Sequence, residues 1–354
     1  MRHRALAFLA CPQCAHALEL SAGAVQGDEI LGGHLGCPSC QARFPIVDGV
    51  PRFAPAALAD DAQRTVERFG EQWTEFDFLS DEYEQQFLGW IAPNDRATFV
   101  DRVVLDGGCG KGRHTRLAAR FGARDVLAID LSAAVDAAYA NTRSLPNVHV
   151  IQADLFRLPI AAGVVDLAFS IGVVHHTPDP REAFMRLVRV LKPGGRIIVW
   201  VYGRENNEWI VRIVDPIRKA VTSRLPHRWL FHLARIPAAA LYVASRGVYR
   251  PLSRPPFQAI GQRLFYQSYI NALGVLPFRD VHLIVHDHLG PAIASYIPGE
   301  EFERWFGDAG LTDVVIGWHN RNSWRGTAIR PAPAEPESAG RVQTTNGAAA
   351  PALR

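Results

Sequence analysis

The residues with the clearest chemical purpose lie in segment 103–115. It reads VVLDGGCGKGRHT, in which an apolar run ends at Asp106 and glycines follow at Gly108, Gly110 and Gly112. Glycines at alternate positions let the backbone approach a ligand closely, because a side chain would fill that space. The carboxylate at the strand end can bind a cationic or hydroxylated group. The pattern predicts a strand, a tight turn and a helix built around a small ligand.

Two common glycine loops do not fit this segment. A dinucleotide fingerprint would need a third glycine where Arg113 stands, and no Gly-Lys-Ser/Thr closes a phosphate loop. A merely tight strand-to-helix turn is the alternative without a ligand. As DxGxGxG, the segment resembles motif I of the class I S-adenosylmethionine (SAM) dependent methyltransferases, in the type 11 group. The resemblance implies that Asp106 and the three glycines hold SAM.

Acidic residues after the next two strands extend this resemblance. Strand 126–129 ends in Asp130, followed by Leu131, where an acid must lie to bind a ribose diol in a doubly wound sheet. The element 148–154, with Asp154 and Leu155 before a Leu-Pro pair, resembles the adenine-contacting segment of the family. We therefore expect these four residues to contact SAM.

The fourth and fifth strands complete the resemblance over residues 99–203. Strand 164–171 runs into GVVHHTPDP, and Pro-Gly-Gly turns the chain into the strand that ends at 203. His175 and His176 stand at the carboxyl end of the fourth strand, facing the crevice where such sheets bind ligands. Either imidazole can remove a proton from an acceptor, with His175 preferred. The alternative is that one of them caps the following helix or fills the pocket wall.

Four cysteines form two matched pairs before the glycine loop. Cys11 and Cys14, then Cys37 and Cys40, are CxxC knuckles separated by 22 residues. Two such turns can offer four sulfurs to one structural zinc, and a redox or disulfide pair is the alternative. The surrounding segments resemble small zinc-ribbon proteins that partner or precede methyltransferases. Cys109, in the glycine loop, is expected to be a reduced thiol.

Aromatic residues recur at helical spacing between the knuckles and the sheet. Within residues 66–90, Trp73 and its neighbours follow steps of mostly three or four residues. Such a stripe packs most often into a core. Methyltransferases of this type commonly open with a helical cap that closes over SAM, and the resemblance implies that Trp73 contacts the cofactor. We expect Pro93 to end the cap.

A histidine cluster lies late in the chain. On a strand, His282, His286 and His288 would share one face, which opens the alternative of a metal site. A polar pocket wall is the favoured interpretation. Asp287 and His288 are candidates for holding the substrate.

Charge is concentrated in the segment before that cluster. The chain of 354 residues carries 38 basic and 35 acidic side chains, a net charge too small to indicate nucleic acid by itself. Residues 204–264, however, contain eleven Arg or Lys against three acids. We expect this insert to form short helices broken by prolines, among them Pro237, and to cover the substrate. Contact with an anionic membrane surface or with RNA stays open.

The predicted fold is α/β: a Rossmann-like, seven-stranded class I methyltransferase sheet with an N-terminal zinc ribbon and a helical insert. The expected domains are a zinc ribbon (1–54), a linker and helical cap (55–98), the SAM-binding core (99–207), a mostly helical insert or lid (208–297), a C-terminal helix with the last two strands (298–330) and a disordered tail (331–354). No uninterrupted apolar run reaches membrane-spanning length, and the apolar run near the start is too short for a secretory signal. We expect a cytoplasmic protein.

The sequence predicts a SAM-dependent methyltransferase that acts on an O, N or C atom of a small, hydrophobic acceptor such as a quinone, polyketide or lipid-like molecule. SAM and a structural zinc are the expected cofactors. One alternative is methylation of a ribosomal or transfer RNA base, with the ribbon and the basic insert holding the RNA. Another is a partner subunit that binds SAM without catalysis. The fold and the cofactor site do not identify the acceptor, because methyltransferases with unrelated substrates share both.

Overall fold

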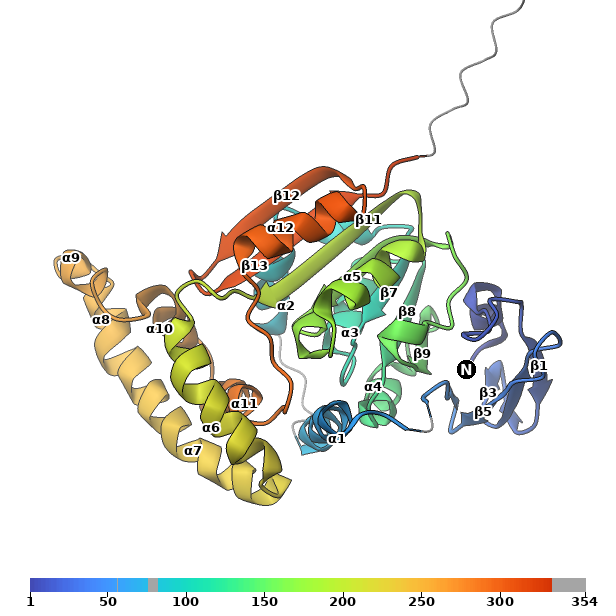
Figure 1. Ribbon diagram of the computed structural model, residues 1–354, viewed down its shortest axis with the longest axis horizontal. Coiled ribbons are helices and arrows are strands. Elements are labelled where there is room, and N and C mark those ends of the chain that lie inside the picture. Colours follow the sequence, from blue (N-terminus) through green and yellow to red (C-terminus); the bar gives the residue numbers. More distant parts are fainter. Residues whose placement is uncertain (56, 76–81, 333–354) are drawn as a thin grey trace, which may run out of the picture.

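A computed structural model describes residues 1–55, 57–75 and 82–332 (Figure 1). Its centre is a seven-stranded sheet in which only β13 runs against the other strands. Across the sheet the strands are β12 (Thr312–His319), β13 (Ser323–Ile329), β11 (Leu191–Tyr202), β10 (Val165–Ile171), β7 (Val103–Gly107), β8 (Asp125–Asp130) and β9 (Val148–Gln152). The predicted Rossmann-like methyltransferase sheet is confirmed.

Alternating side chains of the central strands build a core on each face of the sheet. On β7, Val103 and Leu105 join one apolar cluster, whereas Val104 joins the other. Helices α5 (Pro180–Arg189) and α12 (Gly299–Asp308) contribute to the first cluster, in front of the sheet in Figure 1. The second cluster contains residues of α2 (Glu82–Ile91), α3 (Arg113–Arg120) and α4 (Ala134–Thr142). Every central strand is therefore buried on both sides.

The helical cap consists of α1 (Asp60–Glu75) and α2. Phe87 of α2 is fully buried and stacks on His114 of α3, with ring centroids 4.8 Å apart. Trp90 and Trp200 bring α2 against β11 at a centroid distance of 5.0 Å. Part of the aromatic stripe is thus core, while Phe76 lies outside the described residues.

The insert forms a helical lobe on the opposite side of the core from the N-terminal ribbon (Figure 1). Its elements are η5 (Ile210–Val214), α6 (Asp215–Ala220), η6 (Thr222–Arg224), α7 (His227–Ala244), η7 (Ser245–Tyr249), α8 (Arg250–Leu252), α9 (Gln258–Gly261), α10 (Gln267–Leu273) and α11 (Phe278–Leu289). Among the described helices, none combines the length and the apolar character needed to cross a bilayer.

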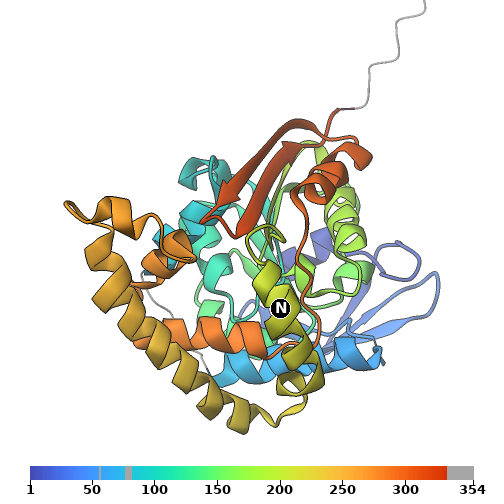
Figure 2. The same ribbon diagram turned by 60° about the vertical axis from the view of Figure 1, so that its left-hand side comes forward.

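Two expectations for the insert were wrong. Pro237 does not break the chain into short helices but lies inside α7, which has 18 residues. Pro237 is exposed, so water can solvate the carbonyl that loses its partner. The segment with His282, His286 and His288 is also no strand. It forms α11, which begins after Pro277 and packs along α7 (Figure 2).

The N-terminal ribbon is a small antiparallel sheet that carries the cysteine cluster. Its main strands are β1 (Glu19–Ala22), β4 (Gly33–Gly36), β5 (Arg43–Val47) and β6 (Val50–Pro51), with a separate pair β2 (Val25–Gln26) and β3 (Glu29–Ile30). The sulfurs of Cys11 and Cys40 are 3.6 Å apart and those of Cys14 and Cys37 are 3.4 Å apart. All four sulfurs lie within 4.8 Å of one another. A tetrahedral zinc with metal–sulfur bonds of about 2.3 Å sets its sulfurs about 3.8 Å apart, so the cluster fits zinc.

The ribbon covers the outer edge of the main sheet at β9. The Phe53 amide donates to the Gln152 carbonyl at 2.7 Å, and the Ala10 amide donates to the Pro159 carbonyl at 3.0 Å. Arg4 pairs with the buried Asp125 at 2.7 Å. An uncovered edge strand presents unpaired backbone groups. The ribbon satisfies part of the β9 edge and shares one apolar cluster with the sheet.

Asp106, at the end of β7, is buried beneath the glycine loop. Its carboxylate accepts a hydrogen bond of 2.6 Å from the Thr115 hydroxyl, and only 1 % of the residue is exposed. Burial raises the pKa of Asp106 to about 7, with Asp130 adding to the rise and the Thr115 hydrogen bond opposing it. The free protein therefore holds this acid partly protonated near neutral pH.

The cysteine cluster predicts one bound zinc per chain. Cys37→Ser should release the metal, make the ribbon sensitive to protease and lower Tm by about 5 °C or more, because metal binding supplies the folding energy of such a small unit. Elemental analysis, limited proteolysis and thermal melts measure these effects. His16→Ala, at an exposed residue beside Cys14, is the control and should keep the metal. A metal-free protein whose N-terminal segment still resists protease would contradict a structural zinc.

Asp106 predicts a stability that depends on pH. Its pKa is higher in the folded than in the unfolded protein, so its contribution to stability is lost as pH rises from about 4 through about 7. Asp106→Asn should therefore exceed the wild type in free energy of unfolding at pH 8, by up to about 4 kcal/mol, and lose this advantage near pH 4. Denaturant titrations without SAM measure the gap. The exposed Glu303→Gln is the control, and equal pH slopes for wild type and Asp106→Asn would refute the assignment.

Candidate functional site

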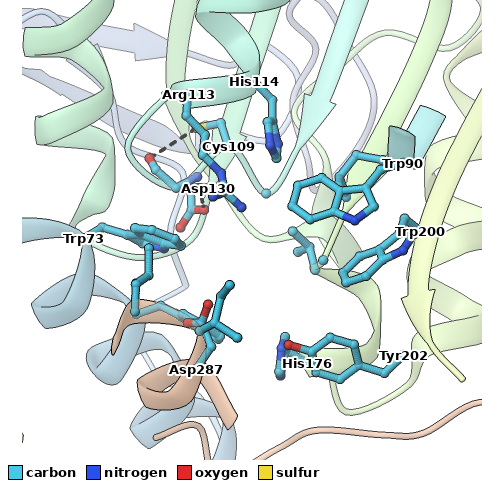
Figure 3. Close-up of a pocket in the computed structure, with 18 of the residues that line it drawn as sticks. Trp73, Trp90, Cys109, Arg113, His114, Asp130, His176, Trp200, Tyr202 and Asp287 are labelled. Atoms are coloured by element: carbon cyan, nitrogen blue, oxygen red, sulfur yellow. Dashed lines mark hydrogen bonds between the residues drawn. The ribbon is translucent and has the colours of Figure 1, made fainter. Parts of the chain in front are cut away.

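One cavity of about 550 Å³ lies at the carboxyl ends of β7, β8 and β10 (Figure 3). The sheet supplies its floor, and residues of α1, α2, α10 and α11 form the opposite walls. This is where an open α/β sheet binds its ligands. The lining brings together the glycine loop, the acids after the strands, one of the two histidines and the aromatic cap.

The glycine loop reaches the cavity at two of its three predicted positions. Gly108, Gly110 and Gly112 all have positive φ, at 95°, 51° and 81°, which favours glycine. A Cβ at Gly108 would collide with Val173, and one at Gly110 would lie 3.0 Å from the Trp73 indole nitrogen. Gly112 instead packs against α4 and does not line the cavity. The loop is therefore shaped by close packing on both sides.

Asp130 connects the glycine loop to the start of α4. One carboxylate oxygen accepts a hydrogen bond of 2.8 Å from the Gly110 amide. The other accepts from the amide and the hydroxyl of Ser132, at 2.9 and 2.6 Å. Burial raises the pKa of Asp130, and these hydrogen bonds oppose the rise. The residue lines the cavity, so the same carboxylate can accept further hydrogen bonds from a ribose diol.

The other predicted cofactor residues lie at different depths. Leu131, Asp154 and Leu155 line the cavity, and the Asp154 carboxylate accepts from the Phe156 amide at 2.9 Å. Trp73 also lines the cavity, opposite the loop (Figure 3). Asp106 does not line it, because its carboxylate turns to Thr115.

Two cations in the glycine loop escaped the sequence analysis. The Lys111 ammonium lies 5.3 Å from the Trp73 ring centre, and the Arg113 guanidinium lies 5.5 Å from the same ring. Arg113 also lies over Tyr83 and Trp90, at 5.2 and 5.6 Å. It forms no ion pair with any residue in the described part of the chain. A basic residue among glycines is the signal that could have revealed this cationic wall.

The wall of the cavity near the loop fits SAM chemically. Asp130 offers a carboxylate to a diol, Arg113 offers its charge to a carboxylate, and Leu131 and Leu155 offer apolar surface to a base. Aromatic rings such as Trp73 stabilise a nearby cation through their π faces. These groups match the ribose, the amino-acid carboxylate, the adenine and the sulfonium of SAM. The residues present can therefore hold SAM.

The structure distinguishes the two adjacent histidines. His176 lines the cavity, and its Nδ1 donates to the Ile293 carbonyl at 2.8 Å. A carbonyl only accepts, so a neutral ring keeps its Nε2 lone pair available. Burial, together with the nearby Arg218 and His288, lowers the pKa of His176 to about 3, although the hydrogen bond to Ile293 opposes this shift. His176 is therefore neutral at physiological pH.

His175 lies behind the cavity wall. It is fully buried, and neither ring nitrogen has a hydrogen-bond partner among the described residues. Its ring packs on Tyr202 and His176, at centroid distances of 4.1 and 4.3 Å. Burial lowers its pKa well below the usual range. Its placement supports a packing role, whereas His176 faces the space where an acceptor would lie.

Aromatic and apolar residues surround the end of the cavity near His176. Tyr202 stacks on His288, with centroids 5.3 Å apart, and the Tyr269 hydroxyl shares a hydrogen bond of 3.2 Å with His288 Nε2. The lining of the cavity as a whole also includes Trp90, Trp200, Ala272, Leu273, Leu276, Leu283 and Ile284. This end is thus suited to a planar or apolar molecule.

Helix α11 closes the cavity by bonding to the cap. Gln72 of α1 is fully buried; its amide donates to Asp287, and its carbonyl accepts from His286 Nδ1 at 2.8 Å. Tyr83 of α2 donates to Asp280 at 3.1 Å. Burial raises the pKa of Asp287 to about 6, with the Gln72 hydrogen bond opposing the rise. These bonds join segments that are more than 190 residues apart in sequence.

The histidine cluster of α11 does not gather around one point. His282 Nε2 donates to the Phe231 carbonyl at 2.7 Å, whereas His286 turns to Gln72 and His288 to Tyr269. Within the described part of the chain, the four ribbon cysteines alone form a group able to hold a metal ion. Asp287 and His288 do line the cavity.

Comparison with known proteins agrees with this architecture. A family model described as "Methyltransferase domain" matches residues 105–199, and one described as "Trm112p-like protein" matches residues 2–49. The first covers the glycine loop and strands β7 to β11. The second covers all four cysteines.

Several curated methyltransferases are similar to part of the chain. The tRNA U34 carboxymethyltransferase of Cellvibrio japonicus is 31% identical over 107 residues, covering 29% of this chain and 33% of the relative. The malonyl-[acyl-carrier protein] O-methyltransferase of a Methylovorus strain is 29% identical over 160 residues, covering 42% and 53%. The chain thus spans about a third to a half of these relatives.

A solved structure that contains the Trm112 methyltransferase activator of Haloferax volcanii aligns with 75% of this chain and 99% of its own, at 14% identity and a TM-score of 0.43. The two family matches fall on the ribbon and on the part of the sheet that carries the glycine loop. The chain therefore contains a methyltransferase domain and, before it in the same polypeptide, a Trm112p-like domain.

Proposed function

We propose that this protein transfers a methyl group from SAM to a small, hydrophobic acceptor bound beside His176. The observation that carries the proposal is a single cavity whose lining includes both Asp130 of the cofactor wall and His176 of the apolar end. Two ligands bound in one cavity can react without leaving it. The names of the relatives support methyl transfer in general and do not decide the acceptor.

The protein's part in the reaction is mainly alignment and exclusion of water. SAM, when bound, supplies a methyl group on a sulfonium that is displaced in line. Asp130 and Arg113 would fix the ribose and carboxylate ends, while Trp73 faces the loop from the cap. The bonds from Gln72 to α11 hold the cap and insert closed over the acceptor. This cover would limit the access of water to the reacting atoms.

His176 is the group that can take a proton from the acceptor. Its Nδ1 is committed to Ile293, so the proton would be accepted at Nε2. Burial keeps the ring neutral, which makes it available as a base at all physiological pH values but a weak one. It therefore suits an acceptor group that is already acidic, such as an enol, a phenol or a carboxylic acid. A carbon or nitrogen acceptor without a proton to lose would not need it.

RNA is the second candidate acceptor. It is favoured by the relative named as a tRNA U34 carboxymethyltransferase and by the cations of the insert. The apolar lining and the closure by α11 favour a small molecule instead. Incubation with methyl-labelled SAM separates the two: label should enter the organic-solvent extract of host cells and not their purified tRNA.

Removing the Asp130 carboxylate should weaken SAM binding. Asp130→Ala loses its bonds to Gly110 and Ser132 and the predicted bond to the ribose, so we expect about 10- to 100-fold lower affinity by calorimetry. Asp136→Ala, at an exposed residue of α4, is the matched control and should bind normally. Unchanged affinity in Asp130→Ala would overturn this role.

His176→Asn tests the base. The asparagine amide can still donate to Ile293 but offers no basic nitrogen, so turnover should fall about 10²- to 10⁴-fold while SAM affinity is kept. In the wild type, the low pKa of His176 should leave kcat without an inflection near pH 6.5. His175→Asn, behind the wall, is the control and should retain most of its turnover. Equal losses in both variants would assign the effect to packing.

A further inference from the structure

Residues 216–279, which form most of the insert, contain ten Arg or Lys and no Asp or Glu. Arg218 and Lys219 pair with Asp215, just before this stretch. Exposed arginines with no ion pair to any described residue include Arg224, Arg228, Arg235, Arg246, Arg254 and Arg263. The insert therefore presents uncompensated positive charge to its surroundings.

Helix α7 has a second apolar face that packs against nothing within the described structure. Its inner face buries Leu230, Ala234 and Ala238, and the two alanines share an apolar cluster with residues of α10 and α11. Its outer stripe follows helical spacing and consists of Trp229, Leu233, Ile236 and Val243, which are 62%, 52%, 71% and 69% exposed. Figure 1 shows α7 along the outer edge of the insert lobe. A helix of a water-exposed lobe normally has polar residues there.

Arginines flank this outer stripe. Arg228 and Arg235 each precede a stripe residue by one position, so they lie along one side of the apolar stripe. Beyond α7 the pattern continues with exposed Val248, Phe257, Ile260 and Phe265, at 45%, 52%, 56% and 61%, among Arg254 and Arg263. Apolar side chains bordered by cations are the composition of helices that lie in a membrane interface.

We propose that the outer face of the insert, defined by the α7 stripe and its continuation to Phe265, binds the surface of an anionic lipid bilayer. The arginines would contact lipid phosphates, and the stripe would enter the boundary between headgroups and acyl chains. An RNA ligand could bind the arginines through its phosphates. It would not explain the exposed Leu233, Ile236 and Val243, because aliphatic side chains neither stack on bases nor bind phosphate.

The bilayer face is connected to the cavity wall. Arg246 donates to the Leu276 carbonyl at 3.1 Å, and Arg250 donates to the Gly274 carbonyl at 3.0 Å. These bonds fix the segment that contains Val275, which is 61% exposed and also lines the cavity. A lipid-dissolved acceptor could therefore enter past Val275. This last step rests on the proposed function, whereas membrane binding does not.

Vesicle flotation with the full-length protein tests the proposal. Protein should float with vesicles of phosphatidylcholine containing phosphatidylglycerol and stay unbound with phosphatidylcholine alone. Binding should weaken as salt increases but not vanish, because the apolar stripe contributes too. Calorimetry with SAM, run on the same samples, reports the cofactor site separately.

Two sets of variants separate the contributions. Trp229→Ser with Ile236→Ser and Val243→Ser removes the stripe, and Arg224→Gln with Arg228→Gln and Arg235→Gln removes cations; each should weaken vesicle binding about tenfold or more. The controls are Val314→Ser with Val315→Ser, which are exposed on β12, and Arg120→Gln with Arg189→Gln. All side chains changed are on the surface, so SAM affinity should stay normal.

The proposal is overturned if wild-type protein fails to float with anionic vesicles, or if the stripe variant floats as well as the wild type. It is also overturned if the arginine variant loses tRNA binding while vesicle binding is unchanged. Normal flotation together with absent SAM binding would instead contradict the proposed function alone.

Discussion

The site depends on one carboxylate at the end of β8. Asp130 holds the Gly110 amide on one side and Ser132 on the other, so that the glycine loop and the first turn of α4 keep a fixed separation. A carboxylate that is partly removed from water is costly unless it is hydrogen-bonded, and three hydrogen bonds stabilise this one. The geometry of the cofactor wall follows from this link, because Trp73 packs directly against the loop that Asp130 positions.

Closure of the cavity depends on a different set of polar bonds. Gln72 joins the cap to α11, and Tyr83 repeats the connection through Asp280. These bonds are buried, where losing one partner leaves the other unsatisfied. The cap and insert therefore act together as a cover, while the ribbon fixes the opposite edge of the sheet at β9.

The sequence alone predicted those parts of the structure that depend on short sequence patterns. Alternating apolar runs, the glycine spacing and the CxxC pairs predicted the sheet, the loop and the zinc cluster, because each depends on neighbours within a few residues. The sequence predicted a mostly helical insert over 208–297 but also suggested a strand for the histidine segment, because closely spaced histidines fit a strand pattern. The segment is helix α11, which packs against α7. Pro237 was wrongly expected to end a helix. It is exposed on α7, so water can solvate the backbone carbonyl that loses its hydrogen bond there. The partnership of Gln72 with Asp287 joins distant segments and had no local signal. Nor does sequence spacing decide which of His175 and His176 faces the cavity, since that depends on the bond to Ile293.

The most direct test of the central claim is a crystal structure of the full-length protein with S-adenosylhomocysteine. The account predicts the ribose within hydrogen-bond distance of Asp130, the carboxylate at Arg113 and the sulfur facing the open, apolar space beside His176. A ligand bound elsewhere, or a sulfur separated from His176 by side chains of the insert, would contradict it.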